Sequence, residues 1–242
     1  KGVEYLLKKN KVDLFMGKGH VASANKVEIK SDGRALSAKN ILIATGARSR
    51  NLPGLTIDGK KVITSREALE LRELPESIVI VGAGATGAEF AYFYQMFGSQ
   101  VTLLEMMPRI LPLEDEEISK VLGESFTKQG IKIRAETQVE GIDIVDGKVT
   151  VKATTPRGPE HITCDKVLVA IGVQANSDGI GLEALGVETN RGFIVRDDRM
   201  ATNVPGIYAI GDVTGPPLLA HVASHQGKIA VEAMAGRETP KI

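Results

Sequence analysis

Residues 77–105 read SIVIVGAGATGAEFAYFYQMFGSQVTLLE, and this stretch decides the predicted fold. It opens with residues 77–81, an apolar run that predicts a buried strand. A glycine loop of the pattern G-x-G-x-x-G follows at residues 82–87 and opens a predicted helix over residues 85–97. Residues 100–105 predict a second strand. The order strand, glycine loop, helix, strand predicts a βαβ unit with parallel strands.

The three glycines of this loop each meet a separate steric demand of dinucleotide binding. Gly82 permits the tight turn, Gly84 lets the backbone approach a diphosphate, and Gly87 lets the helix pack closely on the strand. The diphosphate then sits at the helix N-terminus, where free N–H groups and the helix dipole favour an anion. The alternative, a purely structural glycine turn, is disfavoured by the flanking strand and helix. The residues expected to line the diphosphate are Gly82, Ala83, Gly84, Ala85, Thr86 and Gly87.

Two acidic residues accompany the loop. Glu105 lies 23 residues after Gly82, at the end of the second strand, where its carboxylate can accept hydrogen bonds from an adenosine ribose. Because a carboxylate there repels a 2′-phosphate, we expect NAD rather than NADP. Glu89 is predicted on the first helical turn, and two interpretations stay open for it. It is either an acid that complements the helix dipole or a contact to the nicotinamide end of the cofactor.

The rest of this region continues the α/β pattern. Residues 115–134 predict a second helix and a third strand. Residues 142–153 predict a hairpin that turns at Asp146-Gly147, and residues 166–171 predict a last buried strand. The predicted fold class is therefore α/β, with a Rossmann-like domain that combines a parallel sheet and a β-hairpin or meander.

The segments on either side carry two shorter strand–turn motifs. Residues 40–45 predict a strand that runs into Gly46, and residues 206–210 predict another that runs into Gly211-Asp212. Open α/β sheets present ligand-binding groups at the carboxyl ends of strands, so the Asp212 carboxylate can accept hydrogen bonds from a polyol such as a ribityl chain. The alternative is a turn aspartate that caps the next segment. Thr45 and Gly46 are interpreted as a backbone crossing close to a second dinucleotide.

Composition narrows the classes of function. The 242 residues carry 30 Lys and Arg against 30 Asp and Glu, without a basic block typical of a nucleic-acid surface. No apolar run reaches the roughly 18 residues of a membrane helix. We therefore expect no nucleic-acid partner, no membrane span and a cytoplasmic location. The single cysteine, Cys164, is interpreted as a small buried hydrophobe. His221 and His225 have no evident third ligand, so no metal site is expected.

Three motifs, in this order and spacing, resemble the pyridine nucleotide-disulfide oxidoreductases. They are Ile43-Ala44-Thr45-Gly46-Ala47, Gly82-Ala83-Gly84-Ala85-Thr86-Gly87-Ala88-Glu89 and Gly206-Ile207-Tyr208-Ala209-Ile210-Gly211-Asp212-Val213. The segments Leu218-Leu219-Ala220-His221 and Gly17-Lys18-Gly19-His20 resemble the dihydrolipoamide dehydrogenase branch in particular. The resemblance covers essentially the whole chain. It implies an NAD- and FAD-dependent oxidoreductase in which hydride passes between nicotinamide and flavin, and electrons pass between flavin and a redox disulfide.

The resemblance also implies residue roles and partners. Asp212, after Gly211, would hold the ribityl chain of FAD. Val139 and Gly172 would line the NAD site together with the glycine loop, Glu89 and Glu105. The remaining FAD-side residues implied are Gly19, Thr45, Gly46, Ala47, Leu218, Leu219, Ala220 and His221. The implied partners are NAD(H), FAD and the dihydrolipoyl groups of a 2-oxo acid dehydrogenase complex, with a homodimer in the parent enzyme.

The chain departs from the family pattern in ways that bear on activity. It lacks the first G-x-G-x-x-G that binds the FAD diphosphate, the redox Cys-x-x-x-x-Cys and the dimerisation domain with its His-Glu pair. No residue of this chain is therefore assigned a catalytic role, and the chain is expected to bind nucleotide without lipoamide activity. NADH oxidases and mercuric or CoA-disulfide reductases share the central motifs and stay open as alternatives, as does a non-catalytic NAD(H)-binding module.

The same reasoning predicts the domain organisation. Residues 1–72 and 177–242 are expected to form a partial FAD-binding domain, into which residues 73–176 are inserted as the NAD-binding domain. Near the start of the first segment, the alternation of residues 12–15 predicts a strand.

Overall fold

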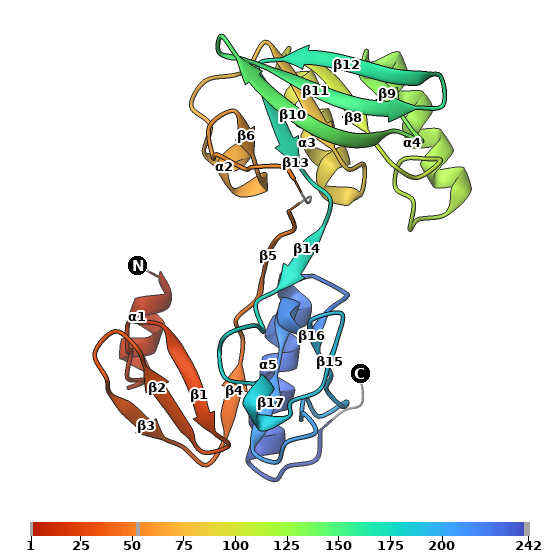
Figure 1. Cartoon of the computed structure of the whole chain (residues 1–242). Coiled ribbons are helices and arrows are strands. Elements are labelled where there is room, and N and C mark those ends of the chain that lie inside the picture. Colours follow the sequence, from red (N-terminus) through yellow and green to blue (C-terminus); the bar gives the residue numbers. More distant parts are fainter. Residues whose placement is uncertain (1, 52–53, 240–242) are drawn as a thin grey trace. The chain divides into compact units, whose positions relative to one another are not determined.

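The computed structural model describes residues 2–51 and 54–239. They form two compact units, each shown in Figure 1: unit 1 comprises the residues up to 48 and those from 174 onward, and unit 2 comprises residues 49–173. Unit 2 is thus inserted in unit 1. Unit 2 begins at residue 49, whereas the sequence had predicted the boundary after residue 72. The boundary lies earlier because the strand at Val62–Ile63 pairs within the sheet of unit 2.

Unit 2 is built on a parallel sheet of five strands. Their order across the sheet is β6-β13-β7-β8-β9, and every neighbouring pair is parallel. The strands are β6 (Val62–Ile63), β7 (Ser77–Val81), β8 (Gln100–Leu104), β9 (Lys132–Arg134) and β13 (Lys166–Val169). The central strand β7 is buried on both faces, which explains its unbroken apolar sequence.

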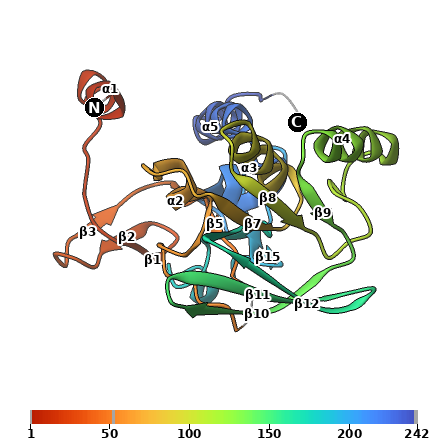
Figure 2. The ribbon, with the colours of Figure 1, turned by 90° about the horizontal axis from the view of Figure 1, so that it is seen from above.

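Helices cover one face of this sheet. The helices of unit 2 are α2 (Ser65–Glu70), α3 (Ala85–Met96) and α4 (Glu116–Lys128). Ile78 and Ile80 of β7 pack into a core with Tyr94 of α3 and Phe126 of α4. Figure 2 shows α3 and α4 on one side of β7, β8 and β9. The connections by α3 and α4 place consecutive strands side by side, as the predicted βαβ order requires.

A three-stranded antiparallel sheet covers the other face. It consists of β10 (Gln138–Val145), β11 (Lys148–Thr155) and β12 (Gly158–Cys164), and Figure 2 shows it opposite the helices. Val79 and Val81 of β7 pack against Val149 and Val151 of β11. The predicted hairpin turn at Asp146-Gly147 is confirmed, with φ angles of 50° and 77° that suit a two-residue turn.

Unit 1 contains shorter elements around a second core. Its central pair is β4 (Ile41–Ile43) with β17 (Ile207–Ala209), which run parallel, and the helix α5 (Ala220–Met234) follows in the chain. The others are α1 (Gly2–Lys9), β1 (Gly19–Ser23), β2 (Lys26–Ile29), β3 (Ala35–Ser37), β15 (Thr189–Asn190), β16 (Phe193–Ile194) and the 3-10 helices η1 (Glu183–Leu185) and η2 (Gly211–Thr214). Residues 12–15 form no strand, so that prediction is wrong, and all four are exposed.

The chain passes between the units twice, at β5 (Ala47–Ser49) and β14 (Val173–Ala175), and these two strands pair with each other. Within the described residues, no helix combines the length and apolar character that spanning a membrane would need.

Candidate functional site

The residues predicted to bind the first nucleotide meet at one edge of the parallel sheet. Val81, the last residue of β7, pairs with Leu104 at the end of β8 and with Val169 at the end of β13. Gly82 and Glu105 directly follow these strand ends. Because carboxyl ends of neighbouring parallel strands share an edge, the loop and the acid lie side by side where open α/β sheets bind ligands.

The glycine loop is shaped by contacts that a side chain would block. Gly82 has φ 98°, and a Cβ there would come within 2.5 Å of the Ala170 carbonyl oxygen. A Cβ on Gly87 would collide with the carbonyl oxygen of Gly82. The loop therefore packs directly against the start of α3, as the predicted roles of both glycines require.

The N-terminus of α3 suits an anion. Its N-cap is Gly84, which makes no side-chain capping bond, and a Cβ on Gly84 would meet open space. Ala85 and Thr86, the first two helical residues, are exposed. The amides of a first helical turn have no partner within the helix, so here they are available to a diphosphate. A glycine loop that has open space at Gly84, beside uncapped amides, fits this part of a dinucleotide.

Glu105 has a role that the sequence pattern did not indicate. Its side chain is buried at 8% exposure, and its Oε2 accepts a hydrogen bond from the Ala83 N–H at 2.7 Å. Oε1 accepts from the Met107 N–H at 2.9 Å. The carboxylate thus ties the glycine loop to the end of β8. Each carboxylate oxygen can accept a further bond, so the chemistry still allows a ribose hydroxyl to donate to it.

Glu89 lies in a different place from the one predicted. Helix α3 begins at Ala85, so Glu89 is its fifth residue, beyond the first turn. The prediction of a first-turn position is wrong, because four helical residues, 85–88, precede Glu89. Dipole effects fall off within one turn, which disfavours the dipole interpretation, and the contact to nicotinamide stays a prediction. Glu89 is exposed and lines, with Thr86, an apolar hollow of about 1090 Å³.

Two further residues predicted for this site lie near the same strand ends. Gly172 follows β13 with φ 98° and is exposed, and its carbonyl oxygen accepts from the Arg50 N–H at 3.0 Å. Val139, on β10, is partly buried against the core that contains Leu104.

In unit 1 the second set of predicted residues also gathers at strand ends. The Ile210 N–H donates to the Ile43 carbonyl oxygen at 3.0 Å, which extends the β4–β17 pairing to the turns that follow. Those turns contain Thr45-Gly46 and Gly211-Asp212. The structure therefore brings these two motifs together, although 166 residues separate Thr45 from Gly211. The Asp212 carboxylate has no hydrogen-bond partner in the part of the chain that the structure describes.

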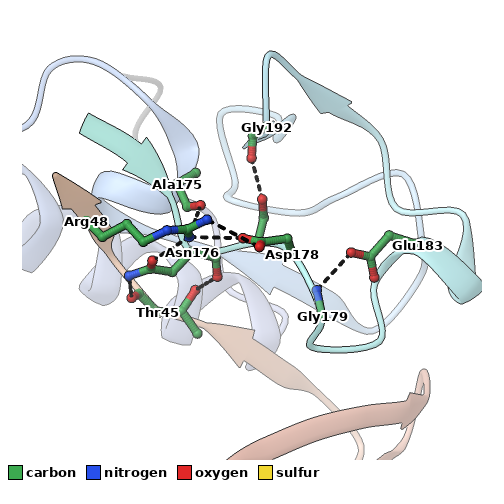
Figure 3. A network of polar contacts seen from close by, with 9 residues as sticks. Thr45, Arg48, Ala175, Asn176, Asp178, Gly179, Glu183 and Gly192 are labelled. Carbon is green, nitrogen blue, oxygen red and sulfur yellow. Dashed lines mark hydrogen bonds and ion pairs between the residues drawn. The ribbon is translucent and has the colours of Figure 1, made fainter. Parts of the chain in front are cut away.

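A polar network that the sequence did not predict surrounds Thr45. The Thr45 hydroxyl donates to the Asn176 carbonyl oxygen at 2.7 Å, and the Asn176 side chain donates back to the Thr45 carbonyl oxygen at 3.0 Å. The Arg48 guanidinium bonds to Asn176 Oδ1 at 2.9 Å and to both oxygens of Asp178 at 3.0 and 3.2 Å (Figure 3). Thr45 thus uses its polar groups to join two segments of unit 1, and its neighbouring backbone remains the part expected near a ligand.

The other predicted residues of unit 1 lie at the starts of elements. Gly19 begins β1 and is exposed, and Ala47 begins β5 and is half-buried. Leu218, Leu219, Ala220 and His221 lead into α5 and are exposed, and the N-cap Leu219 makes no side-chain capping bond. The start of α5 therefore also presents uncapped amides.

Known proteins are similar to this chain over nearly its whole length. The family model of the pyridine nucleotide-disulphide oxidoreductases matches residues 1–227. The chain belongs to this family. Among curated relatives, it is 47% identical to a dihydrolipoyl dehydrogenase of Chlorobaculum tepidum over 241 residues, 98% of this chain and 51% of the relative. It is 45% identical to one from Mycobacterium leprae, covering 98% of this chain and 52% of the relative.

Solved structures of other proteins have a fold similar to that of this chain. The chain is similar to LpdA of Mycobacterium tuberculosis, with a TM-score of 0.89, 32% identity, and coverage of 100% of this chain and 54% of that one. It is also similar to the HOCl-induced flavoprotein disulfide reductase RclA of Escherichia coli, with a TM-score of 0.86, 28% identity, and coverage of 99% and 56%. The chain spans about half the length of the curated relatives it matches.

The cysteine of this family member is buried. Cys164 is 2% exposed and unpaired, and burial raises the pKa of its thiol to about 11. The prediction of a buried small residue is confirmed, and a thiol held in its protonated form is a poor nucleophile. No group of three His, Cys, Asp or Glu residues that could hold a metal ion occurs among residues 2–51 and 54–239.

Proposed function

We propose that this chain is the central part of a flavin-dependent disulfide oxidoreductase of the dihydrolipoamide dehydrogenase type, and that by itself it binds NAD(H) through unit 2. The observation that carries the proposal is the uncapped start of α3 beside a glycine loop that is tied to Glu105. The dihydrolipoyl dehydrogenases that match over 98% of this chain support the type of enzyme.

Each part of the unit 2 site has a proposed task. The amides of Gly84, Ala85 and Thr86 would bind the diphosphate. Glu105 would hold the loop in shape and accept from the adenosine ribose, and Glu89 would contact the nicotinamide end. When bound, NAD(H) supplies or accepts a hydride and FAD is its redox partner. The residues of this chain orient the nucleotide and are assigned no proton transfer.

Unit 1 would hold FAD only weakly. The strand-end turn with Asp212 and the start of α5 offer a carboxylate for the ribityl chain and amides for the flavin ring. The sequence contains a single G-x-G-x-x-G loop, and unit 2 uses it. Unit 1 therefore has no such cradle for the FAD diphosphate. A purified chain that carries tight, stoichiometric FAD would contradict this part of the proposal.

The natural partners belong to the same proposal. We infer that the parent enzyme acts on dihydrolipoyl groups, which is the substrate that the name of the dihydrolipoyl dehydrogenase relatives gives. That this enzyme is a homodimer and serves a 2-oxo acid dehydrogenase complex rests on the resemblance to the family alone. The flavoprotein disulfide reductase RclA shares the fold at 28% identity, so a reductase of another disulfide is the second candidate. Activity of the full-length protein with lipoamide, compared with other disulfides, would separate the two.

A charge placed at the start of α3 tests the binding site directly. Thr86→Glu puts a carboxylate among the amides that would receive the diphosphate. It should lower NADH affinity at least about ten-fold by repulsion, while a first-turn acid leaves the helix as stable or more stable by about 0.3–1 kcal/mol. Calorimetric titration with NADH measures the affinity, and thermal unfolding measures the stability.

The matched control is Thr127→Glu, the same substitution at an exposed position of α4. It should leave NADH affinity unchanged and make α4 slightly less stable, since it adds an acid near a helix C-terminus. Equal NADH affinity in both variants would mean that the nucleotide does not bind at the start of α3.

A further inference from the structure

A buried glutamine in unit 1 contacts the turn that carries Asp212. Gln226 lies on the buried face of α5 and is 2% exposed. An amide buried among apolar groups is costly unless it is hydrogen-bonded. Its Oε1 accepts a hydrogen bond from the Gly211 N–H at 2.7 Å.

This bond supplies a cap that the turn otherwise lacks. Gly211 is the first residue of η2, and the N-cap Ile210 makes no side-chain capping bond. The N–H of a first helical residue has no partner within its helix, so Gln226 supplies one from a distant element. On the other side of the same residue, the Thr214 hydroxyl donates to the Gly211 carbonyl oxygen at 2.9 Å. Side chains therefore hold Gly211 at both its N–H and its carbonyl.

Small residues let α5 come close enough for this contact. The Ala223 Cβ lies 3.3 Å from the position that a Cβ on Gly211 would take. Ile210 Cδ1 lies 3.6 Å from the corresponding position on Gly227. Residues three and four apart share a helix face, so Ala223, Gln226 and Gly227 meet the turn together. Gln226 provides the polar group of this contact.

We propose that Gln226 is a positioning residue that sets the Asp212 carboxylate for a polyol ligand, which in the function proposed above, on which this inference rests, is the ribityl chain of FAD. Asp212 directly follows the residue that Gln226 caps, and its carboxylate has no partner among the described residues. Fixing the backbone at Gly211 fixes the direction in which the Asp212 side chain leaves the chain. A carboxylate held in place binds with a smaller loss of conformational freedom than a mobile one.

Two variants distinguish the effect of the Gln226 hydrogen-bond acceptor from the effect of how its side chain packs. Gln226→Met removes the acceptor at similar length, and Gln226→Glu retains an oxygen that can accept from the Gly211 N–H. The matched control is Gln95→Met in unit 2, which removes a glutamine hydrogen bond to the Gln129 carbonyl oxygen, 2.9 Å in length. The purified chain is titrated with FAD and followed by flavin fluorescence, and with NADH by calorimetry. Amide hydrogen exchange at Gly211 is measured without flavin.

The expected result is a Kd for FAD raised about ten-fold in Gln226→Met and close to wild type in Gln226→Glu and Gln95→Met. Exchange at Gly211 should speed up in Gln226→Met and recover in Gln226→Glu, with NADH affinity unchanged throughout. Equal FAD affinity in wild type and Gln226→Met would overturn the positioning role and leave the proposed function intact, as would equal weakening by both Gln226 variants. A wild-type chain that binds NADH but no FAD would remove the FAD part of the proposed function, and this inference with it.

Discussion

At position 105 one buried carboxylate holds two backbone N–H groups, those of Ala83 and Met107. A carboxylate that accepts charge-assisted bonds from a loop fixes that loop before any ligand arrives. Glu105 therefore contributes to nucleotide binding in two ways, through the shape of the glycine loop and through its own proposed contact to the ribose. The two contributions respond differently to substitution.

Removing the carboxylate should weaken nucleotide binding more than neutralising it. Glu105→Ala leaves the buried Ala83 N–H without a partner, which costs about 1–3 kcal/mol, and removes the partner of the more exposed Met107 N–H, so NADH affinity should fall by one to two orders of magnitude with some loss of stability. Glu105→Gln keeps one acceptor oxygen, so its NADH affinity should fall less. Calorimetry with NADH on both variants measures the difference. Wild-type affinity in Glu105→Ala would show that neither role of Glu105 matters.

A second carboxylate gives unit 2 a pH-dependent stability. Asp165 accepts hydrogen bonds from the Lys148 ammonium at 2.5 Å and from the Ser77 hydroxyl and N–H at 2.8 and 3.0 Å. These bonds, the one from Lys148 first, lower the pKa of Asp165 from 3.8 to about 2. The folded state thus favours the ionised form. Its contribution is complete above the unfolded pKa and is lost as pH falls through the folded pKa.

Asp165→Asn should therefore cost stability only where the carboxylate is ionised. At about pH 7 we expect a loss of about 1–2 kcal/mol, reduced from the full linkage value because the Lys148 side chain is half exposed. The gap between wild type and variant should narrow as pH falls from about 4 to about 2. Urea unfolding across this range measures it. A gap that stays constant down to the lowest pH would contradict the assignment.

At the scale of elements, the features that local sequence determines were predicted correctly, and the features that depend on tertiary contacts were not. The apolar run of β7 and the Asp146-Gly147 turn are local signals, and both appear in the structure. Residues 12–15 carry the alternating pattern of a strand but form none, because an alternating pattern forms a strand only where a neighbouring strand satisfies its backbone.

The candidate site shows the same difference between what local sequence determines and what depends on tertiary contacts. The pattern placed Gly82 and Glu105 correctly at strand ends, since their spacing along the chain determines that position. It could not show the bond from Ala83 to Glu105 or the network of Arg48 and Asn176, because these contacts depend on segments that fold together over 22 to 131 residues. Gln226 gave no signal in the sequence, as a single glutamine in an amphipathic helix has many possible partners.

The contacts drawn in Figure 3 are expected to differ in how much each one stabilises unit 1. The Asn176 side chain donates to the Thr45 carbonyl oxygen and accepts from Arg48, whereas the Arg48–Asp178 ion pair has side chains that are 42% and 64% exposed. An exposed ion pair contributes about 0–1 kcal/mol. Asn176→Ala should therefore lower the free energy of unfolding by about 1–2 kcal/mol, more than Asp178→Ala does. Chemical unfolding of both variants measures this, and a larger loss in Asp178→Ala would reverse the ranking.

At the scale of the whole molecule, the insertion of one unit in another followed from the order of motifs, but the first boundary did not. Residues 49–72 belong to unit 2 because β6 adds a parallel strand beside β13 and Ala68 of α2 joins the helix-side core. A two-residue strand carries too little pattern to be recognised in sequence. The placement matters for function, since it completes the sheet whose edge carries the glycine loop.

A crystal structure of the chain with NAD(H) would show where the nucleotide binds. We expect the diphosphate against the amides of Gly84, Ala85 and Thr86, with the adenosine ribose facing Glu105, whose bonds to Ala83 and Met107 persist. A dinucleotide bound elsewhere on the chain, with the start of α3 vacant, would contradict it.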